Sequence, residues 1–309
     1  VSQRICRNLD CFLLKNEALL KTFVDGSKGA DISIVEGAMG FYDGLDQKGS
    51  GSTAQIAKIL QAPTVLVIDC KRATRSIAAT VMGFQNFDPE VNIVGVILNN
   101  IATVRQKKMI ESCIKEYCNL PILGVVPKNE KISLPSRHLG LIPSGENPEL
   151  KKITEYLRQI MLDSLDIAGL MDLAEKAAPL DFERELKTYP EAQSPRPRIG
   201  IIRDKVFTFY YPENLEALEK ASAELIFIDS LNHRELPPLD GLFIGGGFPE
   251  VFPEELSHNK GFMESVRRKI AAGLPTYAEC GGMLYLGRSL ILNEKRFPMV
   301  GILPFDGLL

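Results

Sequence analysis

Short apolar runs alternate with longer stretches of helical pattern along the first half of the chain. The apolar runs are nearly continuous, which is typical of parallel strands covered on both faces, and they occupy residues 31–36, 64–69, 93–98 and 122–126. Helical patterns lie between or after them, at residues 53–60, 76–84, 104–117 and 148–177. This alternation predicts βαβ units and therefore an α/β domain with a parallel sheet.

The alternation stops in a charged, proline-bearing segment and then starts again. Residues 181–197 include Pro190, Pro195 and Pro197 and show no sustained periodicity, as expected of a linker. Beyond the linker we expect strands at 199–202, 224–228, 241–244 and 275–278, with helices at 213–223 and 261–272. We therefore predict two α/β domains, residues 1–180 and 198–309, each with its own sheet.

Composition and charge narrow the classes of function. The 309 residues are 45% hydrophobic and carry 36 Lys and Arg against 39 Asp and Glu, a formal net charge of −3. The weak negative charge argues against nucleic-acid binding, and no apolar run approaches the length of about 20 residues that spans a bilayer. No secretory signal pattern begins the chain, and the six cysteines form no C-x-x-C pair. We expect a cytoplasmic protein with reduced thiols, no structural metal site, and no nucleic-acid or membrane partner.

A strand–turn–helix pattern surrounds Cys280, in the sequence LPTYAECGGMLYL at residues 274–286. A thiol on such a turn is exposed at the carboxyl end of a parallel sheet, where α/β proteins bind ligands. The start of the following helix favours a thiolate, and the adjacent glycines let backbone N–H groups approach an oxyanion. Cys280 is therefore a candidate nucleophile. The alternative is a buried cysteine at a strand end, with glycines that serve only packing.

Three consecutive glycines follow the predicted strand at 241–244. Such a loop can turn its backbone amides toward a tetrahedral oxyanion. Together with the pattern around Cys280, about 35 residues later, the loop at residues 245–247 is a more specific signal for an oxyanion site than three glycines alone. The alternative for the loop is a flexible connection between a strand and a helix.

The first domain contains candidates for a metal and nucleotide site. Glu36 ends a predicted strand and Asp43 lies just beyond it, and paired carboxylates suit Mg²⁺, although Asp-Gly is also a common turn pair. Asn99 follows another strand and either binds a nucleobase or only ends the strand. The glycine- and serine-rich segment 49–55 lacks the lysine of a phosphate-binding loop, so we favour a helix capping box of Ser52 and Gln55 over direct contact with a ligand.

Seven ordered motifs identify a family. They are RNLD at 7–10, VEGAMGFYDG at 35–44, GSTAQIAK at 51–58, LPSRHLGL at 134–141, FYYPENL at 209–215, GGGFPE at 245–250 and YAECGGMLYL at 277–286. In these motifs the sequence resembles the glutamine-dependent cobyrinate a,c-diamide synthase family. The resemblance implies a first domain similar to dethiobiotin synthetase, with a P-loop-type parallel sheet, and a class I glutamine amidotransferase domain after it.

The resemblance also implies a mechanism and its residues. Cys280 would attack glutamine and release ammonia, with Gly246, Gly247 and Gly281 near the oxyanion and the glutamine. ATP would phosphorylate the a- and c-acetate carboxylates of cobyrinate, and ammonia would displace the phosphate. Glu36 and Asp43 match positions associated with Mg²⁺, while Asp43 and Asn99 are assigned to nucleotide or substrate. The partners are then a tetrapyrrole and glutamine, and a homo-oligomer is left open.

Two alternatives to cobyrinate amidation follow from the same residues. Nickel-sirohydrochlorin a,c-diamide synthases of coenzyme F430 biosynthesis belong to the same family and differ in the macrocycle. A non-catalytic, MinD-like nucleotide-binding protein is the alternative of another class, and the pattern around Cys280 argues against it.

Two motifs of the family are missing from this sequence. The phosphate-binding loop would lie before Val1, and the histidine that follows the nucleophile in the family has no counterpart, since His138, His233 and His258 all precede Cys280. We therefore expect the sequence to be an internal part of a larger enzyme, inactive by itself.

Overall fold

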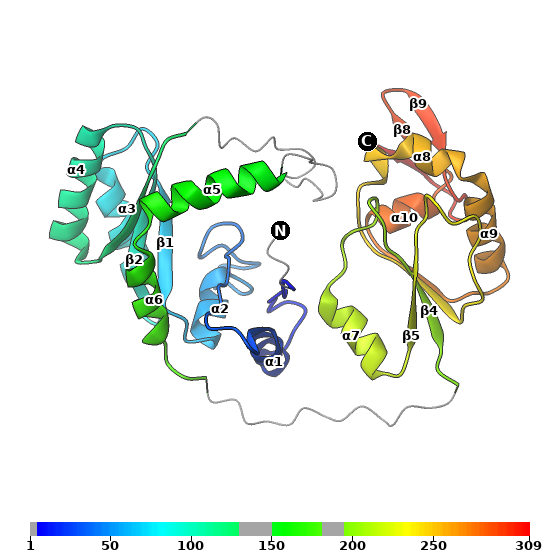
Figure 1. The fold of residues 1–309 in the computed structure, drawn as a ribbon, viewed down its shortest axis with the longest axis horizontal. Coiled ribbons are helices and arrows are strands. Elements are labelled where there is room, and N and C mark those ends of the chain that lie inside the picture. Colours follow the sequence, from blue (N-terminus) through cyan, green and yellow to red (C-terminus); the bar gives the residue numbers. More distant parts are fainter. Residues whose placement is uncertain (1–4, 130–149, 181–194) are drawn as a thin grey trace. The chain divides into compact units, whose positions relative to one another are not determined.

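The computed structural model describes residues 5–129, 150–180 and 195–309. These residues form two compact units, the first comprising residues 5–129 and 150–180 and the second residues 195–309. Each unit contains a parallel sheet and several helices (Figure 1). The predicted α/β class with two domains is confirmed.

The first unit is built on a three-stranded parallel sheet in the order β1-β2-β3. Its strands are β1 (Thr64–Asp69), β2 (Ile93–Ile101) and β3 (Ile122–Pro127). Its helices are α1 (Asn16–Ser27), α2 (Thr53–Ile59), α3 (Ser76–Phe87), α4 (Val104–Cys113), a π-helical turn (Ile114–Cys118), α5 (Leu150–Ser164) and α6 (Ile167–Glu175).

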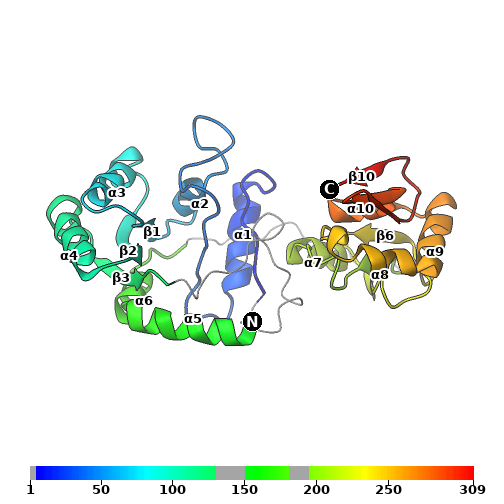
Figure 2. The same cartoon turned by 90° about the horizontal axis from the view of Figure 1, so that it is seen from above.

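The core of the first unit lies between the sheet and the helices α3 and α4 (Figure 2). Leu66 and Ile68 of β1 and Leu98 of β2 pack there against Val81 of α3 and Ile110 of α4. Their side chains alternate along the strands with residues on the other face, as the period of a β-strand requires. The carboxyl ends of β1 and β2 meet in register at Asp69 and Asn99.

Two predictions for the first unit are wrong. Residues 31–36 form no strand, and Ile34 is 85% exposed, because an apolar run becomes a strand only where a neighbour supplies hydrogen bonds. The described part of the single helix predicted at 148–177 is two helices, α5 and α6. The carboxylate of Asp166 caps α6 by accepting a hydrogen bond from the N–H of Gly169 at 2.9 Å, so the chain breaks there.

The second unit contains a four-stranded parallel sheet in the order β5-β4-β6-β7 and a small three-stranded sheet in the order β10-β8-β9. The strands are β4 (Arg198–Ile202), β5 (Glu224–Ile228), β6 (Gly241–Ile244), β7 (Thr276–Ala278), β8 (Ser289–Leu292), β9 (Lys295–Pro298) and β10 (Asp306–Leu308). The helices are α7 (Pro212–Lys220), a 3-10 turn (Pro249–Val251), α8 (Pro253–His258), α9 (Lys260–Ala271) and α10 (Gly281–Leu286).

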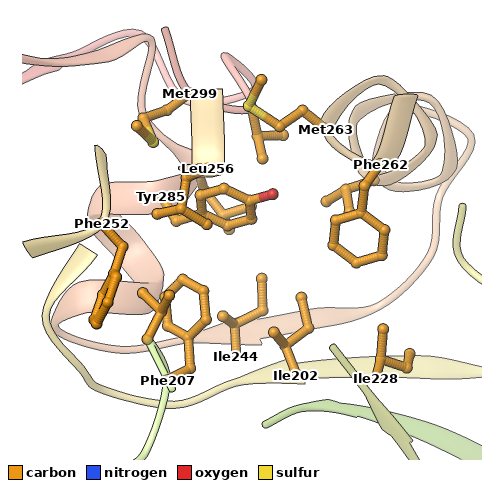
Figure 3. Packing of buried hydrophobic residues seen from close by; sticks show 14 of the residues in the cluster. Ile202, Phe207, Ile228, Ile244, Phe252, Leu256, Phe262, Met263, Tyr285 and Met299 are labelled. Atoms are coloured by element: carbon orange, nitrogen blue, oxygen red, sulfur yellow. The ribbon is translucent and has the colours of Figure 1, made fainter. Parts of the chain in front are cut away.

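A buried apolar layer covers one face of the four-stranded sheet (Figure 3). Ile202, Ile228 and Ile244 lie opposite one another in the register of β4, β5 and β6, and each is at most 2% exposed. Phe262 of α9 and Tyr285 of α10 pack onto this layer. Burial of this layer fixes where each strand ends, and so places the loops that follow the strands.

No helix within the described residues is long and apolar enough to cross a membrane.

Candidate active site

Cys280 lies in the sharp turn between β7 and α10. Its backbone has φ 48° and ψ −118°, a left-handed conformation that is strained for any residue other than glycine. The thiol is exposed to solvent. Strained, exposed residues at such turns are typical of nucleophiles, because the turn holds the side chain clear of the sheet.

Backbone hydrogen bonds fix this turn to the neighbouring strand and helix. The N–H of Glu279 donates to the carbonyl of Ile244 at the end of β6, at 3.1 Å. The carbonyl of Cys280 accepts a bond from the N–H of Leu284, also at 3.1 Å. The position of the thiol is therefore set by the end of β6 as well as by its own strand.

The glycine loop after β6 lies against Cys280. A Cβ atom built on Gly246 would be 3.4 Å from the Cβ of Cys280. A Cβ on Gly247 would be 1.9 Å from the carbonyl oxygen of Val206, and one on Gly281 would be 2.5 Å from the carbonyl oxygen of Gly247. The structure thus brings Gly246, Gly247, Gly281 and Cys280 together, and only glycine fits at the two close approaches.

Gly247 and Gly281, the residues that directly follow Gly246 and Cys280, each carry a backbone N–H that is a candidate donor to a ligand. Within the described chain, the N–H groups of Gly247 and Gly281 donate to no other residue. Gly281 is the first residue of α10, where helix geometry leaves N–H groups without an internal partner. Such donors beside a nucleophile can stabilise a developing oxyanion.

Asp204, in the loop after β4, is a structural residue that sequence reasoning missed. Its Oδ1 accepts bonds from the N–H groups of Val206 and Phe207, at 2.8 and 3.1 Å. Its Oδ2 accepts bonds from the N–H and hydroxyl of Ser230, at 2.7 and 2.6 Å. Val206 in turn accepts from the N–H of Phe248 at 3.0 Å, so the carboxylate holds the segment on which the glycine loop rests. The local signal in the sequence is an Asp just after a strand, because an Asp carboxylate commonly accepts a hydrogen bond from the N–H two residues later.

The buried thiols contrast with Cys280. Burial raises the pKa of the Cys70 thiol to about 11, with the charge of Asp69 as a smaller cause. Burial also raises the pKa of Cys118 above its ordinary value. These thiols stay protonated at neutral pH and are poor nucleophiles.

The two described histidines bind backbone groups of their own segments. Nδ1 of His233 accepts from the N–H of Asp229 at 2.9 Å, and Nδ1 of His258 lies 2.6 Å from the carbonyl oxygen of Glu254. His138 and the motif at 134–141 lie outside the described residues.

The candidate metal- and nucleotide-binding residues of the first unit are exposed or lie at the end of its sheet. Glu36 and Asp43 are exposed, and the N–H of Asp43 donates to the carbonyl of Gly40 at 3.0 Å, which closes a turn over residues 40–43. Asn99 lies at the carboxyl end of the sheet, where its Oδ1 accepts from the N–H of Asn100 at 2.9 Å. Ser52 caps α2 by accepting from the N–H of Gln55 at 3.2 Å.

Asp69 is a further polar residue at this sheet end that sequence reasoning did not select. Its Oδ1 accepts from the amide of Asn100 at 2.9 Å and from the N–H of Lys71 at 3.0 Å. The hydrogen bond from Asn100 is the main cause that lowers the pKa of Asp69. Its position as the last residue of an apolar strand was the available signal.

The exposed carboxylates of the first unit have the chemistry that a magnesium ion uses. Among the described residues, no three His, Cys, Asp or Glu side chains gather to hold a metal ion. Glu36 and Asp43 supply exposed carboxylates, and neither forms a salt bridge within the described chain. Mg²⁺ commonly uses one or two carboxylates together with phosphate oxygens, so these residues fit that ion.

Comparison with known families assigns each unit separately. Residues 198–308 match the family described as the CobB/CobQ-like glutamine amidotransferase domain. Residues 14–136 match the family described as an AAA domain, which is a nucleotide-binding family.

Curated relatives match along nearly the whole chain. The cobyrinate a,c-diamide synthase of Magnetococcus marinus is 43% identical over 98% of this chain and 66% of its own length. That of Archaeoglobus fulgidus is 42% identical over 97% of this chain and 65% of its own length. That of Methanosarcina barkeri is 36% identical over 98% of this chain and 67% of its own length. The chain thus spans just under two thirds of the length of the first two relatives, and it belongs to the cobyrinate a,c-diamide synthase family.

Proposed function

We propose that the full-length protein is an amidating ligase, which uses glutamine and ATP to amidate the a- and c-acetate carboxylates of cobyrinate. The observation that carries the proposal is the exposed Cys280 in a strained turn beside Gly246 and Gly247. This arrangement lies in the unit that matches a glutamine amidotransferase family.

The geometry around Cys280 supports thioester chemistry on glutamine. The Cys280 sulfur attacks the side-chain amide carbon, and a C–S bond forms as the carbonyl electrons move to oxygen. The N–H groups of Gly247 and Gly281 are the donors for this oxyanion, with Gly246 next to the thiol. Collapse breaks the C–N bond, the thiol proton goes to the leaving nitrogen as ammonia departs, and water then hydrolyses the thioester to glutamate.

The first unit supplies the residues for the second half of the reaction. Glu36 and Asp43 would hold Mg²⁺, and the amide of Asn99 at the sheet end, together with Asp43, would bind the nucleotide or the substrate. ATP supplies the phosphoryl group that makes the acetate carboxylate reactive toward ammonia. The two carboxylates would hold the cation, and its charge would offset that of the phosphate oxygens.

A glutamine analogue with a diazoketone group, 6-diazo-5-oxo-norleucine, tests the glutaminase half. The full-length protein is incubated with the analogue, and the modified residue is located by peptide mass spectrometry. We expect modification of Cys280 and none of Cys6, although both thiols are exposed. Cys6 is the matched control, because iodoacetamide should alkylate both. Absence of analogue labelling at Cys280 would contradict the proposal and favour a non-catalytic nucleotide-binding protein.

Amide formation tests the ligase half. Cobyrinate and nickel-sirohydrochlorin are each incubated with the full-length protein, glutamine, ATP and Mg²⁺, and the products are resolved by mass. The proposal expects two amidations of cobyrinate, which require Cys280 when glutamine is the donor but not when ammonia is supplied directly. Amidation of nickel-sirohydrochlorin alone would move the proposal to the other macrocycle.

A further inference from the structure

The hydroxyl of Tyr210 joins the ends of two neighbouring strands. It donates a hydrogen bond to the carbonyl of Ile202, the last residue of β4. It also accepts a bond from the N–H of Gly245 at 2.8 Å, directly after the last residue of β6. One hydroxyl thereby fixes the point at which the glycine loop leaves the sheet.

The ring of Tyr210 fixes the same point by contact. A Cβ on Gly245 would lie 2.7 Å from two carbon atoms of this ring, so the loop backbone passes directly over the ring. The ring also packs edge to face on Phe243 of β6, with centroids 5.2 Å apart. Phe209, the preceding residue, donates its N–H to the carbonyl of Gly246 at 3.0 Å. The loop is therefore held on both sides of the residue that lies next to Cys280.

We infer that Tyr210 is a positioning residue for the reaction at Cys280, because its hydroxyl bridge holds the Gly245–Gly247 loop where the N–H of Gly247 meets the oxyanion. This inference rests on the proposed function. The contacts of Tyr210 are to the loop backbone and to the end of β4, so it acts on the reacting atoms through the loop. A displacement of the loop of about 1 Å is enough to lower turnover by up to about 100-fold.

The hydroxyl of Tyr210 is protonated near neutral pH. Burial is the main cause that raises the pKa of Tyr210 well above its ordinary value. The phenol stays protonated and continues to donate to Ile202 while it accepts from Gly245. The bridge is thus a permanent element of the site.

Tyr210→Phe tests the inference in the full-length protein, since it removes the bridge and keeps the ring. Glutamine hydrolysis in the presence of ATP and cobyrinate should show kcat lowered about 10- to 100-fold and KM changed less than threefold. Alkylation of Cys280 by iodoacetamide, which forms no oxyanion, should stay within twofold of the parent. Hydrogen exchange of the N–H groups at 245–248 should accelerate, while that of β8 and β9 should not.

Tyr285→Phe is the matched control. It removes a buried tyrosine hydroxyl from the same unit, but that hydroxyl forms no hydrogen bond within the described chain. We expect its kcat to stay within twofold of the parent. If Tyr210→Phe alone is too unstable to assay, it is combined with Tyr285→Phe, which is expected to raise stability. The kcat of this double variant is then compared with that of Tyr285→Phe alone.

The outcomes separate the two proposals. Parent-like kcat in Tyr210→Phe, with the parent active and labelled by the diazoketone, overturns the inference alone. A parent that is neither active nor labelled overturns the proposed function and this inference with it. Equal losses of glutamine turnover and of iodoacetamide alkylation would show that Tyr210 merely supports the fold, and would also overturn the inference.

Discussion

Gly247→Ala is expected to damage both the second unit and its site. A Cβ at this position would lie 1.9 Å from the carbonyl oxygen of Val206, 2.8 Å from its carbonyl carbon and 2.9 Å from the Cα of Phe207. All three atoms belong to the backbone, so no side-chain rotation relieves the overlap. Since ordinary contact begins near 3.4 Å, the two segments must separate by about 1.5 Å.

The separation has a structural and a catalytic effect. The segment at Val206 and Phe207 is fastened by the carboxylate of Asp204, so it resists displacement. Overpacking of this kind lowers the free energy of unfolding by about 1–3 kcal/mol. For a unit of this size, that corresponds to a fall in Tm of at least about 4 °C. The N–H of Gly247 moves with its Cα, and loss of one oxyanion donor lowers kcat by about 10²- to 10³-fold.

Calorimetry and glutamine hydrolysis measure the two effects in the full-length protein. Gly246→Ala is the graded comparison, because its Cβ would meet only side-chain atoms, at 3.1 Å and beyond from Phe209 and 3.4 Å from Cys280. We expect it to lower Tm less than Gly247→Ala does. A Gly247→Ala variant with Tm within 1 °C and kcat within twofold of the parent would refute the close-approach argument and the donor assignment together.

Three further predictions concern the described fold. Tyr285→Phe should raise the free energy of unfolding in urea by about 1 kcal/mol, because it deletes a buried hydroxyl without a partner in the described chain. A lower free energy of unfolding would instead show that the hydroxyl has a partner, such as a buried water. Gly83→Ala should raise the free energy of unfolding in urea by about 0.5–1 kcal/mol, because Gly83 is a solvent-exposed residue of α3 and a Cβ there meets nothing within 4 Å. An unchanged midpoint of urea unfolding would contradict this prediction. Lys58→Met should lower Tm at pH 7, because Lys58 binds Asp88 at 2.7 Å and lowers its pKa. That stabilisation is present above the ordinary pKa of 3.8 and is lost as the pH falls through the lowered pKa of Asp88. The difference in Tm between the parent and Lys58→Met should therefore shrink as the pH falls below about 4. A difference that does not change with pH would exclude the ion pair as its source.

The sequence predicted the elements whose pattern is local. The strand predicted at 64–69 has the bounds of β1, because a short apolar run flanked by turn residues needs little more to define it. The run at 31–36 is also rich in β-branched residues but pairs with no strand among the described residues, so local pattern alone misassigned it. The hairpin of β8 and β9 was missed because its turn uses Asn293 and Glu294 at positive φ, without the glycine that usually marks such a turn.

The residues of the candidate site also divide into those with a local sequence pattern and those that only the fold brings together. Cys280 and the glycines belong to short motifs whose spacing is visible along the chain, so they could be selected from the sequence. Tyr210 could not, since its hydroxyl meets Gly245 from 35 residues away, and only the parallel order of β4 and β6 brings the two together. Nor does spacing reveal that Asp204 reaches Ser230 across the end of β5.

The strain at Cys280 explains why so many contacts converge on its surroundings. A non-glycine residue at φ 48° is disfavoured by about 1–3 kcal/mol and persists only where neighbouring structure fixes it. Here the bond from Glu279 to Ile244 fixes the turn, while Tyr210 and Val206 fix the loop that faces it. The contacts of Glu279 and Tyr210 lie at the ends of β4 and β6, so the order of the strands in this sheet helps to place the glycine loop beside the turn at Cys280. If Cys280 is the nucleophile, we expect weakening of the Glu279 or Tyr210 contact to lower turnover more than it lowers Tm, whereas a cysteine that only occupies a turn would show no such excess loss of turnover.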